Sequence, residues 1–423
     1  MIRVLSAFLV AVLMAFPAAA ASEEPRFFLE RIAVSGVRWS SEEVLLSESR
    51  LHEGRAYSES ELRDAVARIR RLPFVLETDF RLEKGSVRDQ YVLAIDVIET
   101  APLFSSLTIG RVVIEPVIRR PPPTPPGGPR PPVGAIPRRT TFRRDGATFG
   151  GRWFIGANGV AHAALEKFGD LQHGKARTSA GYTQYDVFGS GVSLALLVTH
   201  DDREYLPGGL EDSLMRTRDE LSYTAVAAVP LFSNQSVRLS WERTALPVVT
   251  MISADPADGF QAERFRRDVL KAQWIYDTTD DPLLPTHGTI AAVGGSLSEE
   301  PFARPEGGKG VRQSRDVNAR LARYWDLTPR QSVFAGAEFE SYFGWSQTSP
   351  SVRLGYTAGL LNRDQSIRYG ELRFDAAVER VFYQNRGRPM ESYATISTGL
   401  SYRNRWGIAR FDFEYLSWRN LAR

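Results

Sequence analysis

The residues that could perform chemistry in this chain are few, and the most suggestive of them lie in one acidic turn. Asp280 and Asp281 stand side by side before Pro282 and could form a calcium site or a catalytic carboxylate pair, but Asp-Asp-Pro after a strand is also ordinary turn chemistry. The five His residues are scattered, and no Cys supplies a thiolate ligand or nucleophile. No nucleophile elbow, phosphate-binding loop or HExxH zinc motif occurs. The sequence therefore predicts no enzyme, no catalytic residue, no metal site and no cofactor.

The first residues have the pattern of a secretory signal peptide. Arg3 precedes an apolar stretch from Val4 to Phe16, and the small residues Ala19 to Ala21 fit a cleavage site. A membrane anchor is the alternative, but a spanning helix needs ~20 apolar residues, so we expect residues 1–21 to be removed on export. The lack of Cys suits an oxidising compartment, and the net charge of +3 gives no argument for binding nucleic acid.

Residues 26–100 have the pattern of a small α+β domain with the order β-α-α-β-β. Apolar and polar residues alternate over Phe27–Ser35, as in a strand. Two capping boxes, Ser40 with Glu43 and Ser58 with Glu61, precede apolar residues at helical spacing. The two closing strand-like segments are Val75–Lys84 and Tyr91–Ile98.

Residues 147–423 have the pattern of an antiparallel transmembrane β-barrel surrounded by lipid. Apolar Phe374 and Val378, for example, alternate with polar Arg373 and Asp375. A soluble β-sandwich would alternate in the same way, but these segments are long, Trp residues lie near their ends, and short connections alternate with long ones. About 13 segments can be counted, and since an even number is usual we expect about 12 strands. The number becomes 14 or 16 if residues 103–115 or the long loop 344–368 hide strands.

Residues 101–146 are expected to link the two parts. The segment 116–138 is rich in proline, which favours an extended polyproline II spacer of ~3.1 Å per residue. A docking site for a partner that recognises PxxP is the alternative, but composition alone favours the spacer.

The first domain resembles a POTRA domain, and the resemblance covers nearly all of it. The matching motifs, in chain order, are Ile32-x-Val34-x-Gly36, Leu51-x-x-Gly54, Tyr57-Ser58, Leu62-x-x-Ala65-x-x-Arg68-Ile69, Leu72-Pro73-Phe74-Val75 and Val97-Ile98-Glu99. POTRA domains bind unfolded clients or partner proteins by adding a strand to an exposed sheet edge. The resemblance thus implies a client-binding edge with Val75, Phe80 and Leu82, and a groove beside the helix that carries Leu62, Val66 and Ile69.

A second set of residues resembles the barrel signature of the POTRA-plus-barrel superfamily. This superfamily, also called the bacterial surface antigen family, contains outer-membrane protein insertases and two-partner secretion transporters. The signature residues follow Trp274 and Tyr276 and are Asp277, Asp280, Asp281, Pro282, Pro285 and Gly288.

The chain departs from this family in a feature that bears on mechanism. The family's sixth extracellular loop folds into the lumen and carries an Arg-Gly-Tyr or Arg-Gly-Phe tip, whose Arg pairs with an acidic residue of the barrel wall. The loop 344–368 offers Arg353, Gly355 and Tyr356, with one extra residue after the Arg, or Thr357-Ala358-Gly359-Leu360, with no Arg. The wall motif is not evident, and the barrel is shorter than the family's usual 16 strands, which argues against full insertase activity.

Two functions follow from the resemblance. The first is an outer-membrane assembly or translocation factor, whose POTRA domain captures an extended outer-membrane or secreted client in the periplasm. The second is a non-translocating channel or receptor barrel, whose POTRA domain docks a separately encoded periplasmic or surface protein. A soluble periplasmic sandwich is a third, remoter possibility, and the sequence leaves the oligomeric state open.

Overall fold

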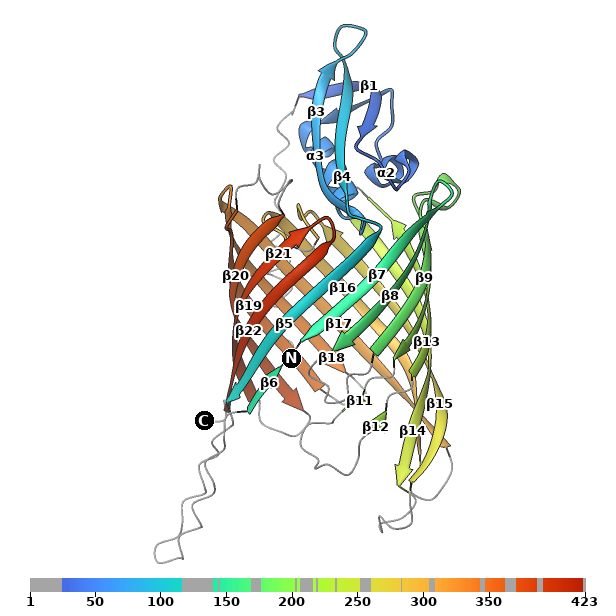
Figure 1. Ribbon diagram of the computed structural model, residues 1–423, viewed down its shortest axis with the longest axis vertical. Coiled ribbons are helices and arrows are strands. Elements are labelled where there is room, and N and C mark those ends of the chain that lie inside the picture. Colours follow the sequence, from blue (N-terminus) through green and yellow to red (C-terminus); the bar gives the residue numbers. More distant parts are fainter. Residues whose placement is uncertain are drawn as a thin grey trace, which may run out of the picture.

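The structure consists of a small N-terminal domain followed by a closed β-barrel (Figure 1). The computed structural model describes residues 25–115, 140–143, 145–168, 176–201, 204–205, 216–217, 220–232, 234–251, 260–282, 284–303, 309–342, 347–361, 370–385 and 391–420. The expected signal peptide and the proline-rich segment 116–138 lie outside these residues. No helix in the described part of the chain is long and apolar enough to cross a membrane.

The N-terminal domain has a four-stranded sheet of order β2-β1-β4-β3 covered by two helices. The central strands β1 and β4 are parallel, and the outer strands β2 and β3 pair antiparallel to them. The element order expected from the sequence is confirmed, with one addition, the four-residue strand β2. The elements are β1 (Arg26–Ser35), α2 (Glu42–Ser49), β2 (Arg55–Ser58), α3 (Glu59–Arg70), β3 (Val75–Lys84) and β4 (Gln90–Glu99).

One of the two expected capping boxes is present. Ser58 and Glu61 form it reciprocally at the start of α3. Helix α2 instead begins after Ser41, whose side chain accepts a backbone N–H of the first turn. The box expected at Ser40 does not form, because Ser40 binds the carboxylate of Glu99 across the domain.

The helices and the sheet enclose one apolar core. Each large side chain in such a core contributes about 1.5–3 kcal/mol when it is fully removed from water. The most deeply buried members are Leu29, Leu45, Leu62, Ile69, Phe74, Leu93 and Ile95, each at most 1% exposed.

The barrel is a closed ring of long, tilted strands. They are β5 (Leu103–Glu115), β7 (Gly146–Ile155), β8 (Gly159–Phe168), β9 (Ala176–Gln184), β10 (Ser193–Asp201), β13 (Glu220–Pro230), β14 (Gln235–Met251), β15 (Phe260–Asp277), β16 (Gly288–Ala303), β17 (Lys309–Thr328), β18 (Gln331–Tyr342), β19 (Gln347–Gly359), β20 (Glu371–Asn385), β21 (Glu391–Asn404) and β22 (Gly407–Asn420). Short additions are β6 (Thr140–Arg143), the 3₁₀ turn η1 (Val187–Gly189) and the hairpin β11 (Glu204–Tyr205) with β12 (Arg216–Thr217).

The ring has 15 strands, so the expectation of about 12, or of any even number, is wrong. The barrel sheet contains 16 strands, but β6 does not add a position to the ring. It pairs with the second half of β5, and β7 pairs with the first half on the same side, so β6 and β7 together occupy one position. With an odd number, the first and last strands run in the same direction, and β5 and β22 accordingly close the ring as a parallel pair. All other neighbours in the ring are antiparallel.

Two strands account for the difference between the 15 strands of the ring and the 13 segments counted in the sequence. Strand β5 lies in residues 101–146, which the sequence assigned to a linker, and β19 lies in 344–368, which it assigned to a loop. The barrel therefore begins at Leu103, and only three residues lie between it and Glu99, where the N-terminal domain ends. The proline-rich segment joins Glu115 to Thr140, at the ends of two barrel strands, and does not separate the domain from the barrel.

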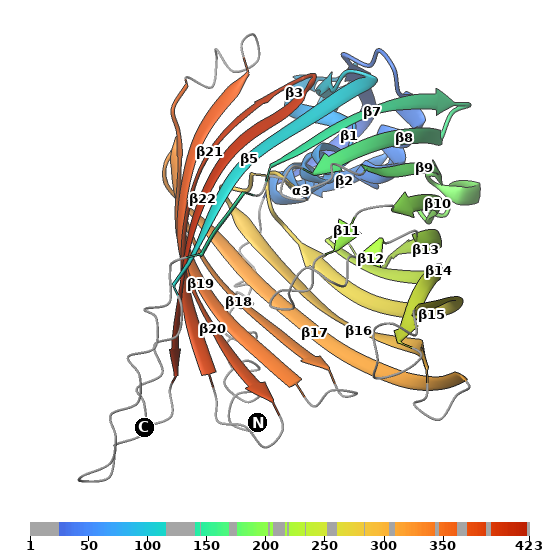
Figure 2. The same ribbon diagram turned by 60° about the horizontal axis from the view of Figure 1, so that its bottom comes forward.

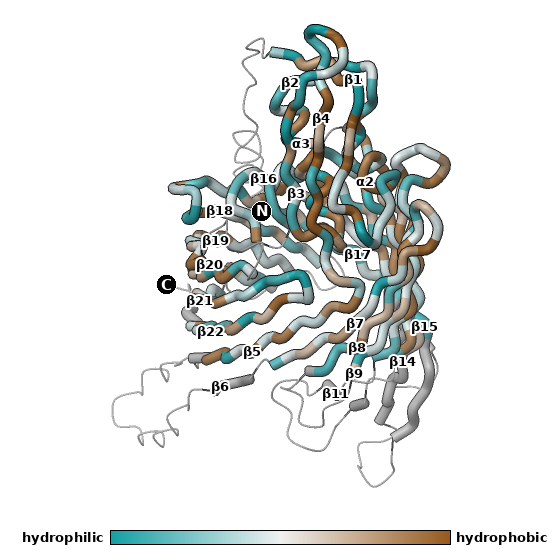
Figure 3. Tube along the Cα trace, turned by 45° about the horizontal axis from the view of Figure 1, so that its top comes forward, coloured by the Kyte–Doolittle hydropathy of each residue, from teal (hydrophilic) through white to brown (hydrophobic). Residues whose placement is uncertain are grey.

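Apolar and polar residues alternate along the barrel strands (Figure 3). The two faces of the wall therefore differ in polarity, as expected for a membrane barrel. On β20, Val378 points outward and is 54% exposed, while Asp375 and Glu379 border a cavity inside the barrel with Arg353 and Arg410. Because the ring is closed and its outer face is apolar, the soluble-sandwich interpretation is wrong.

The outward position of Val378 gives a first prediction. Val378→Arg would place a charge in lipid near mid-strand and should cost about 2–4 kcal/mol of barrel stability, measured by urea unfolding in lipid vesicles. Glu379→Gln, one residue along and facing the lumen, is the matched control and should change stability far less. Equal effects of the two substitutions would show that the register of β20 is misassigned.

Candidate functional site

Strand β3 is an edge of the N-terminal sheet, as the predicted client-binding edge requires. Val75, Phe80 and Leu82 all lie on it. It pairs with β4 on one side, and no strand in the described part of the chain pairs with the other side. The Phe80 and Leu82 side chains pack against the core, so the outward-facing groups at these positions belong to the backbone.

The backbone of β3 alternates between groups that bind β4 and groups that face away. Gly85 N donates to Gln90 O at 2.8 Å just beyond the strand, which makes Glu83, Arg81 and Asp79 the residues bonded to β4. The N–H groups of Phe80 and Leu82 therefore point outward. That of Phe80 donates to Oδ1 of the adjacent Asp79 at 2.8 Å.

The predicted groove beside α3 does not coincide with the residues assigned to it. Leu62, Val66 and Ile69 are at most 5% exposed and form part of the core beneath the sheet. The three residues share one helix face because that face packs against the sheet. A helix that lined a binding groove would show the same spacing of apolar residues, so the sequence alone could not tell the two apart.

The signature residues form the turn between β15 and β16. The Asp280 carboxylate accepts from the N–H groups of Thr286 and His287, and Asp277 accepts from the Thr279 N–H. Pro282 and Pro285 lie in this turn between the two carboxylates and β16. Gly288 ends the turn with φ +101°, where a Cβ atom would lie 2.2 Å from the carbonyl oxygen of Thr278. The turn therefore requires glycine at this position.

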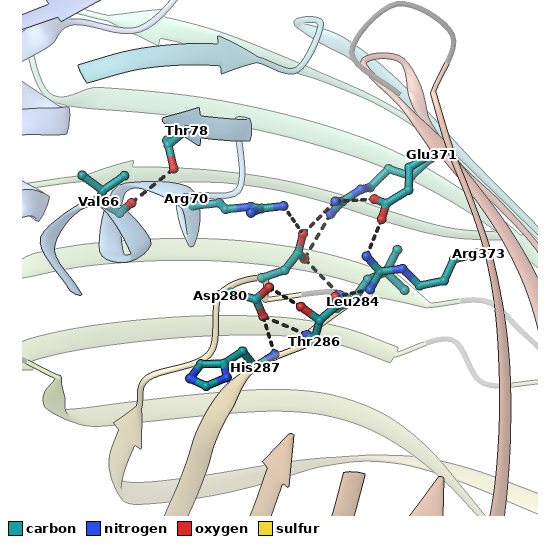
Figure 4. A network of polar contacts seen from close by, with 11 residues as sticks. Val66, Arg70, Thr78, Asp280, Leu284, Thr286, His287, Glu371 and Arg373 are labelled. Carbon is teal, nitrogen blue, oxygen red and sulfur yellow. Dashed lines mark hydrogen bonds and ion pairs between the residues drawn. The ribbon is translucent and has the colours of Figure 1, made fainter. Parts of the chain in front are cut away.

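Asp281 is the centre of an ionic network that joins the turn to the opposite wall. Figure 4 labels Arg70, Leu284, Glu371 and Arg373 of this network. The Asp281 side chain is 1% exposed and receives two hydrogen bonds from Arg403 of β21, at 3.1 and 2.7 Å. Arg403 also pairs with Glu371 of β20 at 2.9 Å, and Glu371 pairs with Arg373. The guanidinium of Arg373 in turn donates to the carbonyl of Leu284, so the turn is held inside the barrel mouth.

The electrostatics of this network keep Asp281 ionised. Burial of the carboxyl group would raise its pKa, but the paired Arg403 and nearby Arg70 outweigh burial and hold the pKa of Asp281 well below its ordinary value.

The end of helix α3 attaches the N-terminal domain to the same turn. Arg70 pairs with Asp281 at 3.0 Å, and Arg71 donates to the carbonyl oxygen of Thr279 at 3.0 Å and lies 3.6 Å from Asp277. The structure thus brings together Asp277 and Asp281 of the signature with two arginines that the sequence did not single out.

Further contacts dock the domain on the rim formed by β7 to β14 (Figure 2). Phe74 meets Phe154 and Tyr185 edge-on, at ring-centre distances of 5.2 and 5.9 Å. Asn234, in the turn before β14, bridges Asp64 and Arg68 of α3. Burial and the nearby Arg50 lower the pKa of Arg68 to about 10, which still leaves it charged at neutral pH.

The predicted lumen-loop tip is not a loop. Arg353, Gly355 and Tyr356 lie within strand β19. The ring of Phe334 on β18 covers Gly355, where a Cβ atom would lie 2.1 Å from it, and Arg353 sits 5.5 Å from the centre of that ring. An ion pair between a turn and the wall does occur elsewhere, where Asp281 in the turn between β15 and β16 binds Arg403 of the wall.

The lumen beneath the domain contains an open space of about 1030 Å³ on the side of β9 to β17. Much of its wall is small or uncharged, as at Ser193, Thr224 and Gly294. Among the described residues, no group of three or more His, Asp and Glu side chains is placed to hold a metal ion.

Removing the buried carboxylate tests the network. Asp281→Ala leaves Arg403 and Arg70 without their shared partner and should cost about 3–5 kcal/mol in urea unfolding, because it leaves buried charge uncompensated. The control is Glu59→Ala, which breaks a solvent-exposed Arg63–Glu59 pair on helix α3 of the N-terminal domain and should cost about 0.2–1 kcal/mol. A small effect at Asp281 would show that the network does not hold the mouth together.

The depressed pKa of Asp281 also predicts a pH dependence. Its ionised form contributes its full stabilisation above the unfolded-state pKa of about 3.9 and loses it only as the pH falls through the lower, folded-state pKa. The stability difference between the wild type and Asp281→Asn should therefore be constant from about pH 8 to 5 and shrink only below about pH 4. A difference that already falls between pH 7 and 5 would contradict this assignment.

Comparison with known proteins gives likeness of fold alone. No protein-family model matches the chain, and no curated protein does. The structure is similar to that of BamA from Haemophilus ducreyi lacking POTRA domains 1–3, with 13% identity, a TM-score of 0.46, and coverage of 94% of this chain and 81% of that one. It is also similar to CdiB from Escherichia coli, with 12% identity, a TM-score of 0.44, and coverage of 93% and 87%. The order of elements seen here, a small α/β domain followed directly by a closed barrel, is the one that the resemblance to the POTRA-plus-barrel superfamily implies.

Proposed function

We propose that the protein resides in a bacterial outer membrane and assists the insertion or secretion of extended client proteins, which its N-terminal domain captures in the periplasm. The observation that carries this proposal is the unpaired edge of β3, in a domain fixed at the mouth of a membrane barrel. An unpaired edge offers backbone donors and acceptors to any extended segment, so it binds by adding a strand.

The orientation of the barrel supports a periplasmic position for this edge. Outer-membrane barrels have short turns on the periplasmic side and longer loops outside. The N-terminal domain lies at the end where β17 and β18 are joined by Pro329 and Arg330, and β21 and β22 by Arg405 and Trp406. At the other end, β10 stops at Asp201 and β13 starts at Glu220.

A receptor or channel barrel that docks one fixed partner is the second candidate, and the turn buried at the mouth favours a receptor over a translocating barrel. The turn that contains Asp281 and Leu284 is buried at the mouth, and α3 is bound to that turn. A client could cross the lumen only after this turn moved, whereas a docked partner would not need the lumen.

Proline substitution at the edge separates the two candidates. Phe80→Pro or Leu82→Pro removes one outward backbone donor without taking a hydrogen bond from β4, and should block strand addition. If the protein assembles or translocates clients, cells carrying either variant should accumulate at least one unassembled outer-membrane or secreted protein in the periplasm, as measured by quantitative proteomics of each fraction.

Two controls make this result specific. Phe80→Leu keeps the N–H and tests the loss of the aromatic ring alone, and heat-modifiable gel migration shows whether each variant still reaches the outer membrane folded. If client levels stay unchanged while one fixed partner no longer co-purifies, the receptor function replaces the assembly function.

A further inference from the structure

One backbone donor on the outward edge of β3 is already hydrogen-bonded to a side chain of the same strand. The carboxylate of Asp79 accepts the N–H of Phe80 at 2.8 Å, and this N–H is one of the outward donors that an added strand would use. An incoming strand must therefore displace Asp79 before it can pair with Phe80. Charged side chains on edge strands commonly prevent unselective pairing.

The exposed face of β3 is predominantly acidic. Alternation along the strand places Glu77, Asp79, Arg81 and Glu83 on the face away from the helices. The single cation, Arg81, is already shared between Glu83, at 2.8 Å, and Asp96 of β4. The carboxylate of Asp79, by contrast, binds a backbone donor at the edge, the N–H of Phe80.

The opposite face of the same strand is apolar. Phe80 and Leu82 are partly buried against the core beneath the sheet. A strand added beside β3 would thus place alternate residues next to an apolar face and next to an acidic one.

The geometry points to a charge-gated edge: Asp79 admits extended segments that carry basic residues on one face and apolar residues on the other. This inference rests on the proposed function and names the class of client. A lysine or arginine of the client, placed across from Asp79, attracts the carboxylate away from the Phe80 N–H and frees that donor for the new strand. An acidic client repels Asp79 and leaves the donor covered.

The expected selectivity follows from the strength of cross-strand pairs. Opposite charges across two strands contribute about 0.2–1 kcal/mol each, and like charges oppose pairing by similar amounts. Replacing basic by acidic residues at two positions of a client should therefore weaken binding about tenfold, and salt should reduce this ratio.

Binding of short peptides to the full-length protein in lipid nanodiscs tests the inference. The probes are two fluorescent eight-residue peptides, one alternating valine with lysine and one alternating valine with glutamate, measured by anisotropy in zwitterionic lipid. The wild type should bind the lysine peptide about tenfold more tightly at low salt. Asp79→Asn, which keeps an acceptor for Phe80 but no charge, should lose most of this preference. Asp79→Ala, which removes this acceptor altogether, should bind the glutamate peptide more tightly than the wild type does.

Glu42→Gln is the control for net charge, because Glu42 is exposed on helix α2 and lies away from the edge strand. It should keep the full lysine preference. Equal binding of both peptides to the wild type, or a preference that survives Asp79→Ala, overturns the charge gate while leaving edge binding intact. If neither peptide binds the wild type, or Phe80→Pro does not weaken binding, the proposed edge function fails and the charge gate with it.

Discussion

A single buried carboxylate holds together parts of the chain that lie far apart in sequence. Asp281 pairs with Arg403 near the end of the barrel and with Arg70 in the N-terminal domain. A buried carboxylate costs several kcal/mol unless it is paired, so each partner must remain in place for the others to be stable. The turn consequently stays inside the mouth, and helix α3 stays against it. The apolar contact of Phe74 with Phe154 and Tyr185 then makes the domain and the rim one packed unit.

The domain sits close to the seam of the barrel because β5, the first barrel strand and one side of the seam, follows it after a short connector. Strands β5 and β22 both begin at the domain's end, so only Thr100, Ala101 and Pro102 separate the domain from the wall. This connector is hydrogen-bonded on both sides, by Ala101 N to Arg405 O at 2.7 Å and by Arg152 N to Pro102 O at 2.8 Å. The seam itself starts where Gly407, at φ +150°, lies against the Ser105 carbonyl, which leaves no room for a Cβ atom. The connector that attaches the domain therefore lies directly beside the strand pair that closes the barrel.

The sequence predicted what local pattern determines and missed what depends on distant partners. The edge strand with Phe80 and the outward face of Val378 follow from alternation, which needs only neighbouring residues. Strand β5 was missed because it precedes a proline-rich segment, and β19 because its residues resembled a loop motif. The roles of Arg70 and Arg403 were not predictable, since an arginine in a helix or strand carries no local sign of the carboxylate it will meet. The burial of Leu62, Val66 and Ile69 shows the same limit, because one spacing serves both a core and a groove.

The fixed position of the domain restricts the path of any client bound at β3. The strand starts at the barrel mouth, where Leu76 and Glu77 border a cavity of about 100 Å³ together with Arg330 and Leu361 of the rim turns. It ends at the hairpin before Gln90, on the side of the domain away from the barrel (Figure 1). A segment paired along this edge therefore meets the rim between β17 and β20 before it meets the lumen, whose mouth is occupied by the Asp281 turn. Delivery to the rim requires only the edge, whereas a client that entered the lumen past the Asp281 turn would have to displace it, and breaking the buried network has a cost that the client's own binding must offset. On this geometry, the rim is the energetically easier destination for a captured client.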